Sequence, residues 1–204
     1  MNKRFAALIA VLASSFLFAG CATQERAAAP DGPYISRGMF DGFKLPVTFM
    51  ALDPDEAKRY TGNTPLREKI SIGEVTYGFV PQTSFVSTAK MWETQLKHFR
   101  EALRASLATT NLLAPDKGGT YILNASVGER KENRPFVGEN TAFFPVQYRL
   151  VRISDGKEIL NAAITGQHAY YEGMSGSSNG QHDYAVRHNI WQLVERLYHL
   201  EKAD

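Results

Sequence analysis

The chain has 204 residues, with 23 basic and 21 acidic side chains, 44% hydrophobic residues and a single cysteine. This near balance of charge excludes strong electrostatic attraction to nucleic acid or to an anionic membrane surface. One cysteine excludes an intrachain disulfide, so an apolar core has to hold the fold together. A chain of this length can bury such a core within one domain.

The first twenty residues have the layout of a secretory signal peptide. Lys3 and Arg4 give a positive start, and residues 5–19 are apolar apart from two serines. Small residues then stand directly before Cys21. The order of basic, apolar and small residues is typical of an exported leader. Its apolar part is about fifteen residues long, whereas a membrane-spanning helix needs roughly twenty, so a cleaved leader is favoured over a permanent anchor.

The sequence LFAGC at residues 17–21 resembles the lipobox of bacterial lipoproteins, which signal peptidase II recognises. The resemblance implies that Cys21 is lipidated through a thioether and that cleavage falls between Gly20 and Cys21. It also implies acylation of the new amino terminus, and two or more acyl chains hold a protein firmly to a bilayer. Lipoboxes favour leucine three places before the cysteine, a place that Phe18 takes in this chain.

The residue after the cysteine bears on location. Lipoproteins kept in the inner membrane usually carry aspartate there, and this chain has Ala22, so the resemblance implies the periplasmic face of the outer membrane. The alternative is an ordinary signal peptide that happens to end at a cysteine. Cys21 would then be an unpaired thiol open to oxidation, which lipidation avoids. Loss of residues 1–20 removes two basic side chains and leaves 21 basic against 21 acidic ones.

Residues 21–46 are predicted to be the lipidated amino terminus and a flexible tether. They are rich in alanine, and Pro30 and Pro33 prevent a long helix. A flexible segment of this length has a reach of roughly 25–30 Å. The alternative is that residues 34–43 pack on the domain as an irregular arm. The rest of the chain, residues 47–204, is predicted to be a single periplasmic domain.

The domain is predicted to begin with a short strand over residues 47–52. Asp53 is then predicted to cap a short helix over residues 54–60, because aspartate accepts hydrogen bonds from the first backbone amides of a helix. Isoleucines alternate with polar residues from Ile70 onward, which predicts a second strand as far as Tyr77.

The most regular helical pattern covers residues 92–107, where apolar side chains recur at steps of three and four residues. Ser87 or Thr88 is predicted to cap its start, and Asn111 with Pro115 to end it. A second stripe of this kind, over residues 186–200, predicts a carboxy-terminal helix.

Three further strands are predicted between these helices. Apolar and polar side chains alternate over residues 121–127, 144–150 and 160–164. The last two are joined by Asp155-Gly156, a pair that tolerates the positive φ angles of a tight hairpin turn. We therefore predict an α+β fold, with an antiparallel sheet of four to five strands and two long helices packed on one face.

Residues 90–170 resemble the small α+β domains of auxiliary lipoproteins in envelope transport and assembly systems. The resemblance lies in the segments ALRASLATTNLLAPDKGGTYIL and VQYRLVRISDGKEIL. It implies a non-catalytic part in lipid or lipopolysaccharide trafficking, and no binding residue carries over from it.

No pattern in the sequence predicts a metal site, a cofactor or a catalytic centre. The five histidines lack the spacing of three or four residues that pairs metal ligands on a helix. Ser175 lies in a stretch similar to a nucleophile elbow, but Ser177 takes the place of the required second glycine, so a loop is favoured.

Apolar residues on loops are the better candidates for a functional surface. Aromatic and aliphatic side chains on a long loop either close the end of a core or mark a contact site. The candidates are Phe136, Val137, Phe143, Phe144, Tyr170 and Tyr171.

The sequence thus predicts an outer-membrane lipoprotein that is anchored through Cys21 and acts as a non-catalytic accessory in envelope assembly or lipid transport. Its expected partners are the membrane and an envelope protein, and no nucleic acid. Two alternatives stay open. A direct carrier of lipid or glycolipid would need an apolar cavity between sheet and helices, and an envelope hydrolase or acyltransferase would use Ser175.

Overall fold

The computed structural model describes residues 50–60, 62–81, 86–115, 118–135, 139–170 and 178–200, without the side chains of residues 86–88 and 178–180. The predicted leader, Cys21 and the predicted tether lie outside these ranges, as do residues 47–49 of the predicted first strand.

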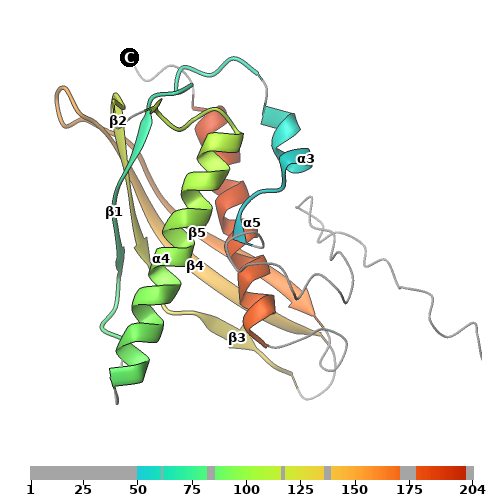
Figure 1. Ribbon diagram of the computed structural model, residues 1–204. Coiled ribbons are helices and arrows are strands. Elements are labelled where there is room, and N and C mark those ends of the chain that lie inside the picture. Colours follow the sequence, from blue (N-terminus) through green and yellow to red (C-terminus); the bar gives the residue numbers. More distant parts are fainter. Residues whose placement is uncertain are drawn as a thin grey trace, which may run out of the picture. The chain divides into compact units, whose positions relative to one another are not determined.

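Five strands form one sheet, and helices accompany it (Figure 1). The elements in chain order are α3 (Pro54–Ala57), a 3₁₀ helix (Lys58–Tyr60), β1 (Ile70–Tyr77), α4 (Val86–Thr109), β2 (Tyr121–Val127), β3 (Lys131–Asn133), β4 (Asn140–Arg152), β5 (Glu158–Tyr170) and α5 (Ser178–Tyr198). The strands lie in the order β1-β2-β4-β5, and β3 pairs with β4 beyond the end of β2. The mixed class with a five-stranded sheet is therefore confirmed.

The prediction of an antiparallel sheet is wrong for one pair, because β1 runs parallel to β2. Between these strands the chain passes through α4, and a helical crossover returns it to start the next strand in the same direction. Alternation along a strand specifies which face is buried. It carries no information on strand direction, so this difference was not visible in the sequence.

Two local predictions also differ from the structure. Residues 50–52 form no strand; all three are buried, whereas the residues of a strand with one buried face would be alternately buried and exposed. Helix α4 already begins at Val86, so Ser87 and Thr88 lie inside it and cannot be its cap.

Predictions at three other element ends are confirmed. Asp53 caps α3, and its side chain accepts a hydrogen bond from the Asp55 amide. After α4, Asn111 adopts a positive φ of 56°, which asparagine tolerates better than most residues. At the β4–β5 hairpin Gly156 has a φ of 72°, as expected of the Asp-Gly pair.

The core lies between the sheet and the long helices. Alternate residues of β2 and β4 are buried, and Phe99 of α4 meets Phe144 of β4 with ring centroids 5.4 Å apart. Burial of each large side chain of this kind contributes about 1.5–3 kcal/mol. The largest fully buried side chains are Tyr148, Phe99, Phe144, Leu66, Ile70, Leu103, Leu107, Leu112, Leu123, Leu150, Ile164 and Ile190.

The Asn189 side chain joins helix α5 to the middle of β4 and β5 through hydrogen bonds. Its amide group donates hydrogen bonds to the carbonyl oxygens of Phe144 (3.0 Å) and Ile164 (2.7 Å), and its oxygen accepts one from the Tyr148 hydroxyl (2.6 Å). Asn189 and Tyr148 are both fully buried. Every polar group of this contact therefore has a partner, as a buried amide requires.

Gly166 of β5 allows this close approach. A Cβ atom at this position would lie 1.9 Å from the Ala185 carbonyl oxygen and 2.6 Å from the Asn189 backbone nitrogen. Both atoms belong to the α5 backbone, so no side-chain rotation relieves the overlap.

We expect Gly166→Ala to destabilise the domain by about 3 kcal/mol, because α5 has to move away from the sheet. Denaturant unfolding followed by circular dichroism measures the loss. Gly62→Ala is the matched control, since a Cβ there meets nothing within 4 Å. Equal stability of the two variants would contradict this account of the contact.

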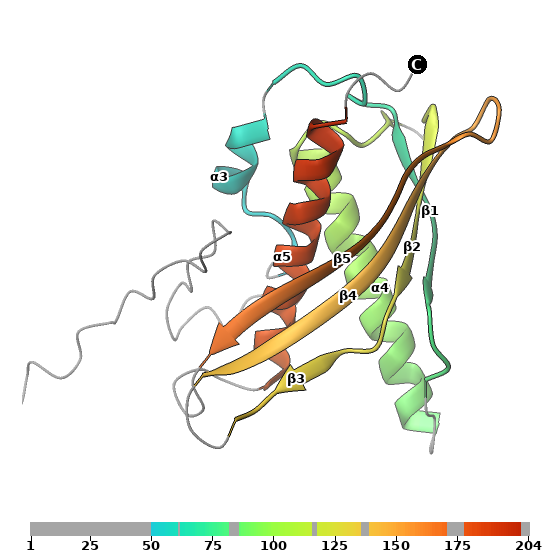
Figure 2. The ribbon, with the colours of Figure 1, turned by 180° about the vertical axis from the view of Figure 1, so that it is seen from behind.

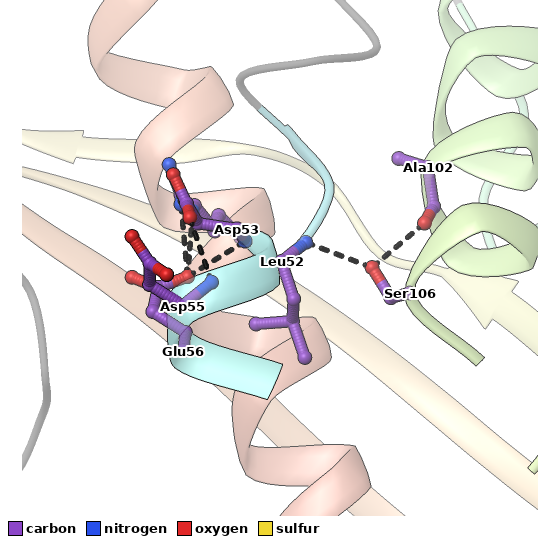
Figure 3. Close-up of polar contacts among 7 residues, drawn as sticks. Leu52, Asp53, Asp55, Glu56, Ala102 and Ser106 are labelled. Carbon is purple, nitrogen blue, oxygen red and sulfur yellow. Dashed lines mark hydrogen bonds and ion pairs between the residues drawn. The ribbon is translucent and has the colours of Figure 1, made fainter. Parts of the chain in front are cut away.

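Residues 50–60, named here the N-terminal strap, bind to both long helices (Figure 3). The Leu52 amide donates to the Ser106 hydroxyl of α4 (2.9 Å), which in turn donates to the Ala102 carbonyl oxygen (2.8 Å). On α5, the Arg187 guanidinium donates twice to one carboxylate oxygen of Glu56, at 2.8 and 3.0 Å.

The end of the strap is held by two tyrosines. The Tyr60 hydroxyl donates to the Glu195 carboxylate of α5 (2.6 Å), and the Tyr198 hydroxyl donates to the carbonyl oxygens of Tyr60 and Thr110. Burial together with the Glu195 carboxylate raises the pKa of Tyr60 above its usual range. The strap therefore connects the start of the domain to the carboxy-terminal half of α5.

We expect Arg187→Gln to cost about 2–3 kcal/mol, because it leaves the Glu56 carboxylate partly buried without its cation. The side chains of Arg187 and Glu56 are 11% and 16% exposed. The loss of stability should be accompanied by faster hydrogen exchange of the backbone amides of the strap.

Lys58→Gln is the control for the strap. The Lys58 and Asp55 side chains of this ion pair are 75% and 66% exposed, and solvent screening leaves such exposed pairs with little effect on stability. A loss as large as that of Arg187→Gln would show that side-chain burial does not decide the strength of these contacts.

Candidate functional site

Charged side chains gather at the end of the domain where β3 lies and where α4 and α5 begin (Figure 1). The group, named here the polar cluster, consists of Arg130, Glu132, Arg134, His182 and Asp183. The first three residues come from β3 and its flanks, and the last two from the second turn of α5. Folding therefore joins parts of the chain that are about fifty residues apart.

Arg130 is a half-buried cation without an ion pair among the described residues. Its guanidinium carbon lies 5.4 Å from the centroid of the Phe144 ring, a cation–π arrangement. Burial lowers its pKa, and the Asp183 carboxyl and the Tyr77 hydroxyl oppose that change. Both groups therefore interact electrostatically with Arg130, and neither makes a hydrogen bond to it in the described part of the chain.

Asp183 is the carboxyl group that faces this cation. Burial raises the pKa of Asp183 from 3.8 to about 7, and Arg130 offsets part of the rise. A carboxyl group with a pKa near neutral exchanges its proton at physiological pH. Such groups concentrate at functional sites.

Two of the remaining members of the cluster have a buried polar atom without a hydrogen-bond partner among the described residues. Burial, and then the charge of Arg130, lowers the pKa of His182, and its Nδ1 atom is buried with no hydrogen-bond partner in the described part of the chain. Glu132 pairs with Arg134 at 2.7 Å through one oxygen, while its other oxygen is buried and unpartnered within the same ranges. Glu132 points toward the helices because its register partner is Ala142, which is fully buried.

Aromatic side chains border the cluster on the side of α4. The Tyr77 hydroxyl donates to the Trp92 carbonyl oxygen (2.8 Å), and the two rings meet edge to face at 5.5 Å. Phe79 packs against both rings. Val80 and Met91, which neighbour Phe79 and Trp92 in the sequence, are 91% and 46% exposed.

The surface predicted from loop aromatics is only partly described. Phe136, Val137 and Tyr171 lie outside the described residues, as do Ser175, Gly20 and Cys21. Phe143 is half-buried on the sheet face opposite the core.

Two of the predicted surface residues belong to the core. Phe144 is 1% exposed and Tyr170 is 6% exposed, so neither side chain offers a contact surface. This is the alternative that the sequence left open, in which aromatic residues close the end of the core. Strand alternation gives the reason: Phe143 and Phe144 are consecutive in β4 and therefore point to opposite faces.

The polar cluster was missed in the sequence, although one signal for it existed. Asp183 precedes Val186 by three residues and Ile190 by seven, which places it on the apolar stripe of α5. Helix α5 begins at Ser178, so Asp183 lies inside the helix and is not its cap. An acidic residue on an apolar stripe was the available sign of a buried carboxyl group.

The described residues contain no group of three or more histidine, cysteine, aspartate or glutamate side chains placed to hold a metal ion. None of their helices combines the length and apolar character needed to cross a bilayer.

We expect the stability of the protein to fall as the pH rises from 5 to 8, relative to that of Asp183→Asn. In this range the folded state keeps a proton on Asp183 that the unfolded chain releases, so a higher pH favours unfolding. A pKa of about 7 gives a difference of about 3 kcal/mol at most over this range. Thermal and denaturant unfolding at several pH values measure it.

Two features make the comparison of the unchanged protein with Asp183→Asn specific for Asp183. The lowered pKa of His182 makes the folded state more stable as the pH rises, which is opposite to the effect of Asp183. Because His182 is present in both proteins, its effect drops out of the difference between them. Glu93→Gln on the exposed side of α4 is the control and should follow the unchanged protein. If the free energy of unfolding changed with pH in the same way for the unchanged protein and for Asp183→Asn, a raised pKa of the Asp183 carboxyl would be refuted.

Comparison with known proteins gives distant structural matches. No protein-family model and no curated protein matches the chain. A candidate lipoprotein from Caulobacter crescentus is 16% identical, with 70% of this chain and 95% of that chain covered and a TM-score of 0.42. The PelC dodecamer from Paraburkholderia phytofirmans is 18% identical (65% and 89% covered, TM-score 0.38). A minor lipoprotein from Acinetobacter baumannii is 20% identical (65% and 91% covered, TM-score 0.33).

Proposed function

We propose that this chain is a lipid-anchored lipoprotein of the bacterial cell envelope, and that its domain is a non-catalytic accessory in envelope assembly or lipid transport. The observation that carries the proposal is Cys21, the only cysteine of the chain, at the end of a basic, apolar and small-residue leader. Lipidation accounts for a lone cysteine at that position, because it removes a thiol that would otherwise be open to oxidation.

The architecture of the domain fits attachment through its amino terminus. The N-terminal strap is the first described segment after Cys21, and polar contacts hold it to α4 and α5. A flexible tether over residues 21–46 would leave these contacts of the strap undisturbed.

The outer membrane is the proposed location, with the domain on the periplasmic side. Ala22 supports this location, because lipoproteins retained in the inner membrane usually carry aspartate at that position. The proposed partner is another envelope protein, which such an anchored domain would meet in the periplasm.

We expect Cys21→Ser to abolish incorporation of labelled palmitate and to release the protein from the outer-membrane fraction. Serine has no thiol to form the thioether, so neither the diacylglyceryl group nor the cleavage that depends on it can follow. Metabolic labelling and density-gradient fractionation of cells that produce the full chain measure both effects.

Two neighbouring variants sharpen this experiment. Thr23→Ser is the matched control and should be labelled and fractionated as the unchanged chain is. Ala22→Asp should keep the label and shift the protein to the inner membrane. Unchanged labelling and membrane association of Cys21→Ser would exclude the proposed anchor.

A direct lipid carrier is the less favoured function. It would need a cavity between the sheet and the helices, where the fully buried side chains of Phe99, Phe144 and Tyr148 lie. Native mass spectrometry of the purified protein tests this alternative, because a carrier should retain a co-purified lipid.

A further inference from the structure

Strand β5 forms an edge of the sheet, because β4 is its one partner among the described strands. The backbone groups on its outer side follow from Pro145 of β4, which lies opposite Thr165. The Pro145 carbonyl oxygen accepts a hydrogen bond from the Gly128 amide on the far side of β4 (2.8 Å), so this pair is one whose backbone groups point away from each other. Since alternate residues share a direction, the N–H and C=O groups of Asn161, Ala163 and Thr165 point out of the sheet.

Helix α5 covers only part of this outer edge. The Gln192 Nε2 atom donates to the Thr165 carbonyl oxygen (3.3 Å), and the His188 Nδ1 atom lies 2.9 Å from the Gln167 carbonyl oxygen and 3.2 Å from its backbone nitrogen. Toward the hairpin, β4 and β5 extend past the helices in both views (Figures 1 and 2). In the described part of the chain no side chain reaches the outward backbone groups of β5 on the hairpin side of Thr165.

The uncovered part of the edge has no chemical protection against pairing. Residues 159–167 include no charged side chain and no proline, the residues with which natural edge strands discourage a second strand. The irregularity in the pairing of β5 lies at its hairpin end, before Leu160. The opposite edge, β1, is protected: its register is interrupted between Ile72 and Val75, and the exposed Glu74 lies in that interruption. The edge at β5 is therefore the one suited to accept another strand.

We propose that two copies of this chain associate through antiparallel pairing of their β5 strands, with Ala163 of one copy opposite Ala163 of the other. A two-fold axis at this residue places Asn161 of each copy opposite Thr165 of the other. The residues of each pair can then exchange both of their N–H···O hydrogen bonds. This inference goes beyond the proposed accessory function and does not depend on Cys21.

The edge is complementary to its own copy. Asn161, Ala163 and Thr165 are exposed on the sheet face away from the helices, and none carries a charge that would meet the same charge in the second copy. The register is set by what bounds the open segment, which is α5 from Gln167 onward and the irregularity before Leu160. The Thr165 carbonyl oxygen has two lone pairs, so it can accept from the second copy while it keeps its bond from α5.

The test is disulfide crosslinking of the full chain in freshly broken cells that produce it, under mild oxidation. Ala163→Cys should give a disulfide-linked dimer. The Cα atoms of such an opposite pair lie about 5.5 Å apart, within the span of about 4.4–6.8 Å that a disulfide bridges. The unchanged chain, whose one cysteine is Cys21, sets the background.

A second crosslink tests the register. Asn161→Cys and Thr165→Cys should form a mixed dimer when they are produced together, and neither should crosslink when it is produced alone. Each of these positions lies about 14 Å from its own copy, four residues away along the strand. Glu74→Cys, at an exposed position of the other edge strand, is the matched control and should stay at the background.

A charge at the axis should separate the two copies. Ala163→Lys, introduced into both chains of the mixed pair, should lower the crosslinked fraction at least tenfold, because two lysines then lie directly opposite each other. Gln147→Lys is the matched control. It adds the same charge on the same sheet face, but on β4 opposite Ala163 and away from the axis, and it should leave at least half of the crosslink.

Three results would overturn the proposal. They are background crosslinking in both Ala163→Cys and the mixed pair, crosslinking of Glu74→Cys as strong as theirs, or a crosslink of Ala163→Cys to a protein of different mass in place of its copy. The last result would assign the edge to another protein. None of these results affects palmitate labelling of Cys21, so the pairing of β5 and the membrane anchor are judged separately.

Discussion

The close contact of α5 with β5 at Gly166 is the constraint on which the rest of the structure depends. Without a side chain at this position the helix backbone reaches the strand, and Asn189 can then bond to both central strands and to the Tyr148 hydroxyl. Once α5 is fixed at its middle, both of its ends are placed. Asp183 lies six residues earlier, about 9 Å along the helix axis, and Glu195 lies the same distance later.

The two ends of α5 differ in how their charges are satisfied. At its middle Arg187, and toward its carboxyl end Glu195, bind the N-terminal strap through short hydrogen bonds, so the charges there are paired. At the amino end, Asp183 and Arg130 face each other without such a bond. A fold can tolerate a few unmatched polar groups, and they often coincide with a site that binds something. This contrast is the reason for placing the candidate functional site at the end near β3.

The N-terminal strap and the polar cluster make different kinds of contact. Polar contacts through Leu52, Glu56 and Tyr60 hold the strap to α4 and α5. Near the start of α4, the rings of Tyr77, Phe79 and Trp92 pack on one another.

The sequence by itself determined the features that depend on neighbouring residues. The cap at Asp53, the turn at Gly156 and the alternation of β2 and β4 are all patterns within a few residues, where local stereochemistry decides the outcome. Only the tertiary structure decided the parallel direction of β1, the burial of Phe144 and Tyr170, and the burial that raises the pKa of Asp183. These depend on which distant segments pack together, and a carboxyl group acquires a pKa near neutral only when such packing removes it from water.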